Sequence, residues 1–415
     1  MSVLHEKHIT LIVTGSIAAY KACELVRLLS KARADVHVIL TPAAERFVGA
    51  TTFEALSGNP VLTDASHTPL SHIHLAQDAC DLILVAPASA DTLAKIALGI
   101  ADNLALQTVL ARTVPLLVAP AMNTAMWENP ATRRNVRLLK EDGILFVGPV
   151  SGSLACGTTG AGRMIEPLDI VQAAEKALTK PVLAGKKLLI TAGPTYEAID
   201  PVRGLTNRSS GRQGYALAQA AFAAGADVTL VSGPVTLKAP YGVTVVSVTS
   251  ARDMQDAVMS RLQGTDAFIG VAAVADWRPT QTETHKIKKD TNGTPNLTLC
   301  ANPDILAGVA ASPDRPACVV GFAAETENEI AQAQVKLTKK GLDMIVANNA
   351  PNTFGKGSNC ATLITKDAVR TLPELDKIEL AHEILVSVAR MLKARPYTTL
   401  DSSLDYTRLS RGGTK

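Results

Sequence analysis

Residues 9–31 read ITLIVTGSIAAYKACELVRLLSK and decide the fold of the first half of the chain. The β-branched run at 9–13 predicts a strand, and Gly15 and Ser16 form the turn that ends it. Apolar residues of the following segment, 17–31, recur at the spacing of one helix face. The stretch therefore predicts one strand–turn–helix unit of an α/β sheet.

Further units of this kind follow. Strands are predicted at 36–40, 82–86 and 116–119, and the last two run into the same tetrapeptide, Val-Ala-Pro-Ala. Because these strands lack polar alternation and are separated by helices, they predict a parallel sheet covered on both faces. Ligands bind beyond the carboxyl ends of such strands. We therefore expect the turn at Gly15 and both Ala-Pro-Ala turns to line one crevice.

The pattern pauses near residue 182 and then restarts. Pro181 and Gly185 precede a new first strand at 187–191, and a long loop leads from it to a helix at 213–224. Further predicted strands are 228–232, 268–272, 319–322 and 344–347. The second half is therefore expected to be another α/β domain, followed by a polar tail.

Composition excludes several classes of protein. A chain of 415 residues is too long for one comfortable core and indicates more than one domain. The net charge of +3 is spread along the chain and aromatic residues make up 4%, so binding to nucleic acid has little support. The start lacks the apolar core of a signal peptide, and apolar runs are too short to span a bilayer. Six widely spaced cysteines without a Cys-x-x-Cys pair predict reduced cytosolic thiols.

Individual residues of the first half, taken one at a time, each allow more than one role. The turn at Gly15 is not a G-x-G-x-x-G, so it lacks the NAD fingerprint. Ser16 could instead help bind one phosphate at the start of the helix, or it could simply cap that helix. If residues 71–75 formed a strand, His72 and His74 would face one side and could hold a metal, although a third ligand at usable spacing is missing. As a loop histidine, His72 would only be solvated.

Asn123 and Cys156 are equally ambiguous when each is taken alone. Asn123 follows a buried strand at the predicted ligand edge, where a plain turn amide is the alternative. Cys156 lies in residues 152–164, which read GSLACGTTGAGRM and contain four glycines. A loop with this backbone-entropy cost is expected to be functional. Its thiol could be a nucleophile, an acid, a redox partner or a bystander.

Ordered motifs along the chain make a family resemblance visible. In the first half these are 15–21 (GSIAAYK), 71–73 (SHI), 86–91 (APASAD), 99–104 (GIADNL), 120–123 (PAMN) and the glycine-rich loop around Cys156. In the second half they are 191–195 (TAGPT), 200–203 (DPVR), 207–211 (NRSSG), 272–276 (AAVAD), 286–289 (KIKK), 302–305 (NPDI) and 321–326 (GFAAET). The first set resembles flavin-containing phosphopantothenoylcysteine decarboxylases and the second resembles phosphopantothenate–cysteine ligases. Nearly the whole chain, except the tail, resembles the fused bifunctional enzymes of bacterial coenzyme A synthesis.

The resemblance implies a fold and an assembly. It implies two three-layer α/β domains: a flavodoxin-like or Rossmann-like flavoprotein domain over 1–181 and a Rossmann-like ligase domain over 182–394. The polar tail is 395–415. A cytoplasmic homo-oligomer built from decarboxylase trimers and ligase dimers is expected.

Two successive reactions are also implied. The ligase would join 4′-phosphopantothenate to L-cysteine through an acyl-cytidylate made from CTP, with Mg²⁺ on the triphosphate and its protein ligands unassigned. The decarboxylase would convert the product to 4′-phosphopantetheine, with FMN as transient electron acceptor.

For the decarboxylase, the family's roles carry over to matching positions. His72 would assist proton removal, Asn123 would bind the departing carboxylate, and Cys156 would protonate the enethiolate. A thiol with an ordinary pKa of about 8.5 could do this without special tuning. The expected FMN contacts are Gly15, Ser16, Ile17, Thr41, Pro87, Ala88 and Ser89. Substrate contacts are Met122, Arg163 and Met164, with Arg163 helping the loop close.

For the ligase, Asn207 would handle the acyl-cytidylate, with Arg203 as the nearby cation. The expected nucleotide and substrate contacts are Ala273, Asp276, Lys286, Pro303, Asp304, Ile305, Phe322, Lys336 and Lys340. Lys336 and Lys340 lie four apart on a helix and could hold the triphosphate, the alternative being a solvated helix end. Residues 204–206, 212–213 and 354–359 differ from the usual family pattern. We expect these differences to change binding affinity more than catalytic activity.

Two other classes stay open. A nicotinamide-dependent oxidoreductase could have two doubly wound domains, but its fingerprint is missing here. A flavin-binding regulatory homologue without chemistry would be expected to lack His72, Asn123 or Cys156, and all three are present.

Overall fold

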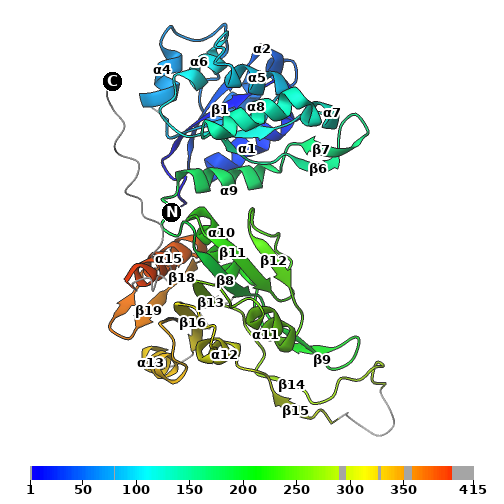
Figure 1. The fold of residues 1–415 in the computed structure, drawn as a ribbon, viewed down its shortest axis with the longest axis vertical. Coiled ribbons are helices and arrows are strands. Elements are labelled where there is room, and N and C mark those ends of the chain that lie inside the picture. The colour runs from blue at the N-terminus through cyan, green and yellow to red at the C-terminus, as the bar shows by residue number, and fades with distance from the viewer. Residues whose placement is uncertain (1, 79, 289–295, 326–328, 350–357, 395–415) are drawn as a thin grey trace, which may run out of the picture.

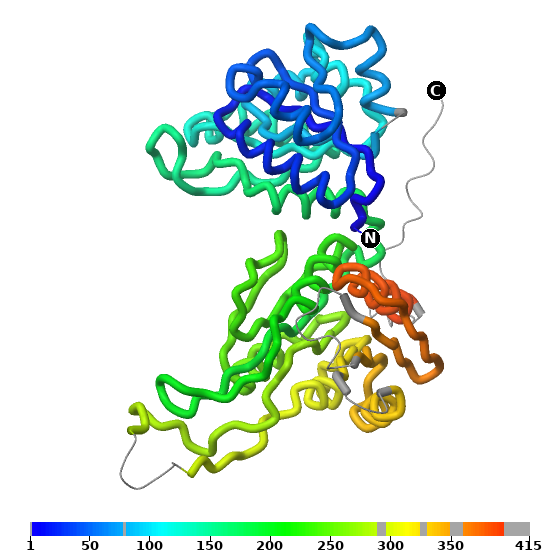
Figure 2. The backbone as a smooth tube through the Cα atoms, turned by 180° about the vertical axis from the view of Figure 1, so that it is seen from behind, coloured from blue at the N-terminus to red at the C-terminus, as the bar shows by residue number. Residues whose placement is uncertain are grey.

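A computed structural model describes residues 2–78, 80–288, 296–325, 329–349 and 358–394. The predicted tail and residues 354–357 lie outside this part of the chain. Figures 1 and 2 show two lobes, one formed by the first part of the sequence and one by the second. In the described part of the chain, helices are too short or too polar to cross a membrane.

The N-terminal sheet has five strands, all parallel, in the order β2-β1-β3-β4-β5. This is a doubly wound order whose direction reverses between β1 and β3. The strands are β1 (His8–Val13), β2 (Asp35–Leu40), β3 (Leu82–Ala88), β4 (Leu116–Pro120) and β5 (Leu145–Phe146). The predicted parallel sheet is therefore confirmed, and its first four strands lie where the apolar runs predicted them.

Helices cover both faces of this sheet, which explains why its strands lack polar alternation. On β3, Leu82 and Leu84 pack into one core and Ile83 and Val85 into the other. The first face carries α1 (Ala19–Lys31), α2 (Pro42–Glu45), α3 (Ala50–Ser57) and α9 (Pro167–Leu178). The second carries α5 (Ala90–Ala97), α6 (Leu104–Leu110) and α8 (Pro130–Glu141).

Residues 71–78, for which a strand and a loop were both open, form neither. The chain forms a short helix, α4 (Ser71–Ile73), that continues into a π-helix, η1 (His74–Asp78). Leu75 and Ala76 are consecutive and both buried, which a half-exposed strand would not allow. Thr10 on β1 donates to the carbonyl of Leu75 and holds this turn against the sheet.

The C-terminal sheet has eight strands in the order β12-β11-β8-β13-β16-β17-β19-β20. Six are parallel, and β19 and β20, which sequence analysis missed, are antiparallel. The strands are β8 (Lys187–Ala192), β11 (Asp227–Ser232), β12 (Thr244–Ser247), β13 (Ala267–Gly270), β16 (Cys318–Glu325), β17 (Met344–Asn349), β19 (Ala361–Thr365) and β20 (Val369–Thr371).

Helices again cover both faces, so the second α/β domain is confirmed. One face carries α10 (Arg212–Ala223) and α15 (Lys377–Ala394). The other carries α11 (Ala251–Met259), α12 (Ile305–Ala311) and α13 (Glu329–Lys339). The strand order reverses between β8 and β13, as it does between β1 and β3 in the first domain.

Short hairpins and one short helix lie outside the two sheets. The hairpin of β6 (Val150–Ser153) and β7 (Thr159–Arg163) contains Cys156 in its turn and contacts α7 (Thr124–Glu128). In the second domain β9 (Tyr196–Ala198) pairs with β10 (Gly204–Thr206), β14 (Trp277–Pro279) with β15 (Leu299–Ala301), and β18 (Ser358–Asn359) with β21 (Leu375–Asp376).

Polar side chains join the two domains where α9 meets α10. Gln219 donates to Glu175 at 2.8 Å, and Lys238 pairs with Asp169 at 2.9 Å. Burial raises the pKa of Glu175 above its usual range, although hydrogen bonds from Gln219 and Ser2 act to lower it.

Candidate functional sites

A cavity of about 380 Å³ opens at the carboxyl ends of β1 and β3, where the strand order reverses. This is the edge at which doubly wound sheets bind ligands. The turn after β1, the start of α5, the segment after β4 and the β6–β7 hairpin all contribute to its wall. Of the predicted residues, the lining contains Gly15, Ser16, Ile17, Ser89, Met122, Asn123, Cys156, Arg163 and Met164.

The turn after β1 is closely packed beneath this cavity. A Cβ on Gly15 would lie 2.5 Å from the Cβ of Ala43, so only glycine fits there without a shift. The N-cap of α1, Ala18, provides no side-chain hydrogen bond to the first turn of the helix. Ser16 accepts a bond from the Ala18 amide at 3.3 Å instead. The Ala19 and Lys21 amides donate to the Ser16 and Ala18 carbonyls, each at 3.0 Å, and the helix dipole favours an anion at this end of α1.

Three predicted FMN contacts, Thr41, Pro87 and Ala88, lie outside the cavity lining and pack next to the turn. Pro87 and Ala88 belong to β3, and the Pro87 carbonyl accepts from Thr14 at 2.7 Å. Thr41 caps α2 by accepting from the Ala44 amide at 3.3 Å. Ser89 does line the cavity and caps α5.

Asn123 and Cys156 meet at the mouth of the cavity, although they are far apart in sequence. The Asn123 Nδ2 donates to the Cys156 Sγ at 3.1 Å, and the Thr158 Oγ1 also lies 3.1 Å from that sulfur. Hydrogen bonds from Thr158 first, then from Asn123, lower the pKa of Cys156 below its ordinary value. The acid role expected of this thiol does not depend on such tuning, since a thiol of ordinary pKa is already mostly protonated at neutral pH. A lower pKa makes the thiol a stronger proton donor.

Glycines let the hairpin lie close against the segment that follows β4. The Met122 amide donates to the Gly162 carbonyl at 2.9 Å. Gly162 has a φ of 128°, and a Cβ there would overlap the Met122 carbonyl oxygen. A Cβ on Gly160 would lie 2.5 Å from the Thr124 Oγ1. The glycine-rich sequence is thus explained by close packing that positions Cys156.

We expect Gly162→Ala to reduce the decarboxylation that the sequence resemblance implies by about 10- to 100-fold, while the implied ligation stays unchanged, because the hairpin must move away from Met122 and displace Cys156. Steady-state rates of both reactions measure the effect. Gly49→Ala is the matched control, since a Cβ at Gly49 would contact nothing within 4 Å. Equal decarboxylation by both variants would contradict the positioning role of the hairpin.

A charged cluster lies at the base of the hairpin. Glu166 accepts from Arg163 at 2.6 Å and from Lys21 at 2.9 Å, and Lys21 also donates to the Met164 carbonyl at 3.3 Å. These bonds, that of Lys21 above all, hold the pKa of Glu166 below its usual value. Lys21 is only 9% exposed and lines the cavity, yet it was missed as a site residue. The sequence did offer a signal for this residue, because Lys21 lies on the same face of α1 as its buried apolar residues.

His72 does not reach this cavity within one chain. It is half-buried on α4, and Figure 1 shows α4 and the β6–β7 hairpin on opposite sides of the domain. The structure therefore brings Asn123 and Cys156 together but leaves His72 apart from both.

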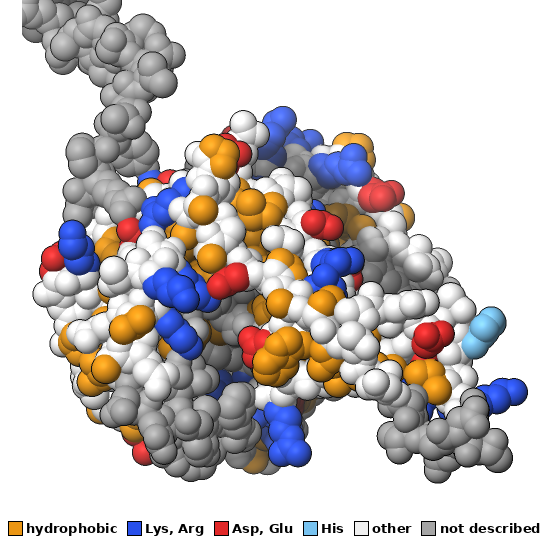
Figure 3. Space-filling model, turned by 90° about the horizontal axis from the view of Figure 1, so that it is seen from below, with side chains coloured by type: hydrophobic (Ala, Val, Ile, Leu, Met, Phe, Trp, Pro, Cys, Tyr) orange, Lys and Arg blue, Asp and Glu red, His pale blue; other side chains and the backbone are white. Residues whose placement is uncertain are grey.

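A second cavity, of about 1250 Å³, lies at the carboxyl ends of β8 and β13. Its wall is formed by the start of α10, the loop after β13, the segment before α12, and the side chains of Phe322 and Lys340. Figure 3 shows the molecule from below, with cationic, anionic and apolar side chains interspersed over that side of its surface. Of the predicted ligase residues, the lining contains Asn207, Ala273, Asp276, Pro303, Asp304, Ile305, Phe322 and Lys340.

Asn207 holds the loop that follows β13. Its Nδ2 donates to the carbonyls of Ala273 at 3.3 Å and Val274 at 3.0 Å. Asn302 donates to the Ala275 carbonyl at 2.8 Å from the other side. The loop backbone is therefore fixed by two amide side chains that both line the cavity.

Lys340 enters the lining while Lys336 is exposed outside it. The Lys340 Nζ lies 2.8 Å from the Asp304 Oδ2, and Asp304 also caps α12 through the Ala307 amide at 3.0 Å. Burial acts to raise the pKa of Asp304, but the bonds from Lys340 and Ala307 outweigh it and lower that pKa.

Arg203 and Lys286 also lie outside the lining. Arg203 is paired with the buried Asp200, Nε to Oδ2 at 2.9 Å, and donates to the Ile287 carbonyl at 2.8 Å. This guanidinium lowers the pKa of Asp200 strongly. Arg203 thereby ties the β9–β10 hairpin to the segment next to the exposed Lys286.

Lys377, at the start of α15, is a cavity residue that sequence analysis missed. Burial first, and then the charge of Arg212, lower the pKa of its ammonium group. Gln213 donates to the Lys377 carbonyl at 3.1 Å and joins α15 to the start of α10. Two cations therefore lie close to each other at the start of α10, an arrangement suited to a polyanion.

Two family models match the chain. One, described as Flavoprotein, covers residues 2–179, and the other, DNA/pantothenate metabolism flavoprotein C-terminal domain, covers 183–392. The coenzyme A biosynthesis bifunctional protein CoaBC of Vibrio vulnificus strain YJ016 is 44% identical over 400 residues, 94% of this chain and 100% of the relative. That of Bacillus subtilis strain 168 is 45% identical over 402 residues, 94% of this chain and 98% of the relative.

Solved structures resemble each half. The C-terminal domain of a coenzyme A biosynthesis bifunctional protein CoaBC is 44% identical, with a TM-score of 0.45, and the match covers 52% of this chain and 99% of that chain. The FMN-dependent cysteine decarboxylase SpaF is 31% identical, with a TM-score of 0.37, and the match covers 43% of this chain and 97% of that chain.

Proposed function

This chain belongs to the family of bifunctional coenzyme A biosynthesis proteins, and from that premise we propose a division of the two reactions between its two cavities. It is a flavoprotein enzyme with a decarboxylase domain and a ligase domain. The proposal assigns the decarboxylation of 4′-phosphopantothenoylcysteine to the cavity under Cys156. It assigns the joining of 4′-phosphopantothenate to L-cysteine to the cavity beside Asn207.

The contact between the Asn123 amide and the Cys156 thiol carries the decarboxylase assignment. An amide has two N–H donors, so Asn123 can bind the departing carboxylate while it still holds the sulfur. After CO2 leaves, Cys156 donates its proton to the carbon of the enethiolate, and the hydrogen bonds that lower its pKa stabilise the thiolate that results.

FMN fits the residues at the end of β1. A phosphate suits the glycine turn and the positive end of the α1 dipole, with Ser16 and Ser89 beside it. Bound there, FMN supplies the transient oxidation of the substrate thiol that makes loss of the carboxylate possible. Purified protein should therefore carry flavin absorption or gain it with added FMN. A colourless protein that takes up no FMN would remove the decarboxylase assignment.

Separation of His72 from Asn123 and Cys156 supports a site completed between subunits. His72 is half-buried on α4, on the side of the domain opposite the hairpin, so it could complete the cavity of a neighbouring chain. We therefore propose that trimers of the decarboxylase domain form the active unit, with ligase domains pairing as dimers. His72 would act there as the base of the oxidative stage.

The ligase cavity suits CTP at the start of α10. Arg212, Lys377 and Lys340 would face the triphosphate, Mg²⁺ would help to neutralise its charge, and Asp276 and Phe322 would contact the nucleoside. A carboxylate oxygen of 4′-phosphopantothenate attacks the α-phosphorus, and pyrophosphate leaves. The cysteine amine then attacks the acyl carbon, loses a proton, and CMP leaves. Because the reaction uses CTP, we propose that it takes place in the cytoplasm.

Lys340→Gln should raise the KM for CTP about tenfold with a smaller effect on kcat, because one charge-assisted hydrogen bond to the triphosphate is lost. CMP formation at varied CTP concentration measures this. Lys339→Gln is the matched control, since Lys339 is exposed on the same helix end and lies outside the cavity. An unchanged KM in both variants would favour a merely solvated helix end.

A further inference from the structure

Three metal-ligating side chains lie together at the edge of the N-terminal sheet opposite the proposed FMN site. His8 begins β1, and Asp35 and His37 lie at the start of the edge strand β2. Strand register pairs His8 directly with Asp35, and His37 is two residues further along β2. Side chains two residues apart on a strand point to the same face, so all three share one face of the sheet.

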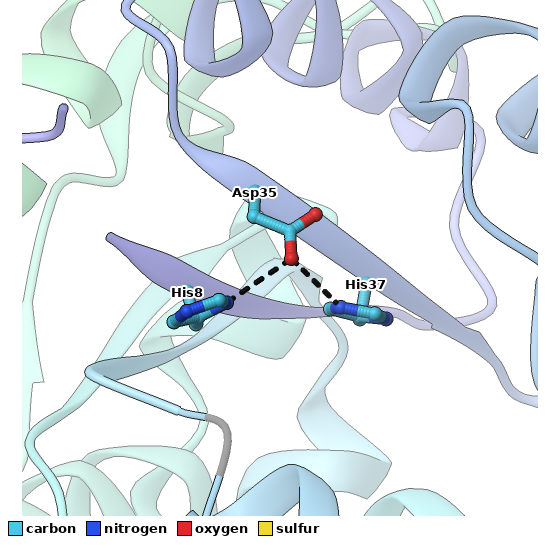
Figure 4. Close-up of side chains that lie close together, drawn as sticks. All are labelled: His8, Asp35 and His37. Atoms are coloured by element: carbon cyan, nitrogen blue, oxygen red, sulfur yellow. Dashed lines mark hydrogen bonds and ion pairs between the residues drawn. The ribbon is translucent and has the colours of Figure 1, made fainter. Parts of the chain in front are cut away.

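Their ligand atoms converge on one point (Figure 4). The Asp35 Oδ2 lies 3.0 Å from the His8 Nδ1 and 3.2 Å from the His37 Nε2. The three ligand atoms lie within 4.8 Å of one another. In a tetrahedral zinc site with bonds of about 2.05 Å, neighbouring ligand atoms are about 3.3 Å apart. The two short distances therefore need little adjustment to accommodate a zinc ion.

A second layer of contacts fixes the carboxylate. The Asn59 Nδ2 donates to the Asp35 Oδ1 at 2.7 Å and to the Val36 carbonyl at 3.0 Å. The other carboxylate oxygen, Oδ2, is thereby directed at both imidazoles. Outer partners of this kind orient metal-binding carboxylates and raise metal affinity.

The surroundings leave room for an ion and for a water ligand. The side chains of His8, Asp35 and His37 are 47%, 41% and 28% exposed. The neighbouring Lys7 is paired with Asp81 at 2.8 Å, and Asp81 also accepts from the His8 amide at 2.9 Å. The charge of Lys7 is thus balanced by Asp81.

We propose that His8, Asp35 and His37 form a zinc-binding site, with water as the fourth ligand. Two imidazoles and one carboxylate are a ligand set for Zn²⁺ rather than for Mg²⁺, which prefers oxygen ligands. The site is therefore chemically distinct from the proposed Mg²⁺-triphosphate site of the ligase cavity. Because it joins β1 to the edge strand β2, a bound ion would stabilise the native sheet. Within the described residues, this is the one group of three such side chains with converging ligand atoms.

Zinc binding to the full-length, chelator-treated protein tests the proposal, by calorimetry and by equilibrium dialysis with metal analysis. We expect His8→Gln and His37→Gln each to weaken Zn²⁺ binding by about 100-fold or more, because loss of even an outer partner costs about 10- to 100-fold. His74→Gln is the control: His74 is an exposed histidine of the same domain, and its loss should leave this binding unchanged.

A thermal readout separates binding from misfolding. Zn²⁺ should raise the Tm of the wild-type protein and of His74→Gln, but not that of His8→Gln or His37→Gln, whose metal-free Tm values should match the wild type. If the three side chains form only hydrogen bonds, Zn²⁺ binding and the Tm shift will be the same in all four proteins. That result, or equal loss in His74→Gln, would overturn the proposal.

Discussion

Cys156→Ser is expected to retain CO2 release while formation of 4′-phosphopantetheine falls by about 100-fold or more, the usual contribution of a general acid. A serine hydroxyl can accept the same hydrogen bonds from Asn123 and Thr158, so the hairpin should keep its place. Its pKa is far above that of a thiol, so it cannot deliver the proton at a comparable rate. Mass spectrometry of the product and a coupled assay for CO2 measure the two outcomes separately.

Cys360→Ser is the matched control, because Cys360 is also an exposed free cysteine but lies in the ligase domain. It should decarboxylate like the wild type. Unchanged product formation by Cys156→Ser would refute the acid role. Retained flavin absorption in both variants would show that the flavin-binding domain is intact.

Asn207→Asp is expected to reduce ligase turnover by about 100-fold, the usual cost of one lost hydrogen-bond donor in an active site, and to leave decarboxylation unchanged. The native amide donates to the carbonyls of Ala273 and Val274. A carboxylate at the same position would oppose both carbonyl oxygens and would also repel the phosphates of the acyl-cytidylate. CMP release measures ligation, and supplied 4′-phosphopantothenoylcysteine measures the other reaction.

Asn129→Asp is the matched control, because it introduces the same charge at a position where a carboxylate is tolerated. Asn129 caps α8 by accepting from the Ala131 amide at 2.9 Å, a role that aspartate performs equally well. Both activities should survive in this control. Loss of both activities in Asn207→Asp would indicate a folding defect, whereas full ligase activity would remove Asn207 from the site.

Much of the fold could be predicted because short stretches of sequence determine where its strands begin and end. The apolar runs that became β1 to β4 are short and end at Gly, Pro or Thr, and both cavities follow from where parallel strands end. The helical turn at His72 was not predicted, and one contact that holds it comes from Thr10, distant in sequence, which bonds to Leu75. Local spacing alone cannot show such a contact.

The contacts within the sites were harder to predict, since each joins distant segments. Asn123 meets Cys156 only because the hairpin returns across the segment after β4, and Gln213 reaches the Lys377 carbonyl only after α15 packs on α10. Some signals were present in the sequence. Asp200, three residues before Arg203, indicated an ion pair that occupies that arginine.

One assay tests the central claim directly: the full-length protein, with its flavin, receives 4′-phosphopantothenate, L-cysteine, CTP and Mg²⁺, while CMP, CO2 and 4′-phosphopantetheine are followed together. We predict that all three form in equal amounts and that omission of CTP abolishes all three. CMP without CO2 would leave only the ligase assignment. Absence of CMP, with supplied 4′-phosphopantothenoylcysteine still decarboxylated, would contradict the division of two reactions between the two cavities.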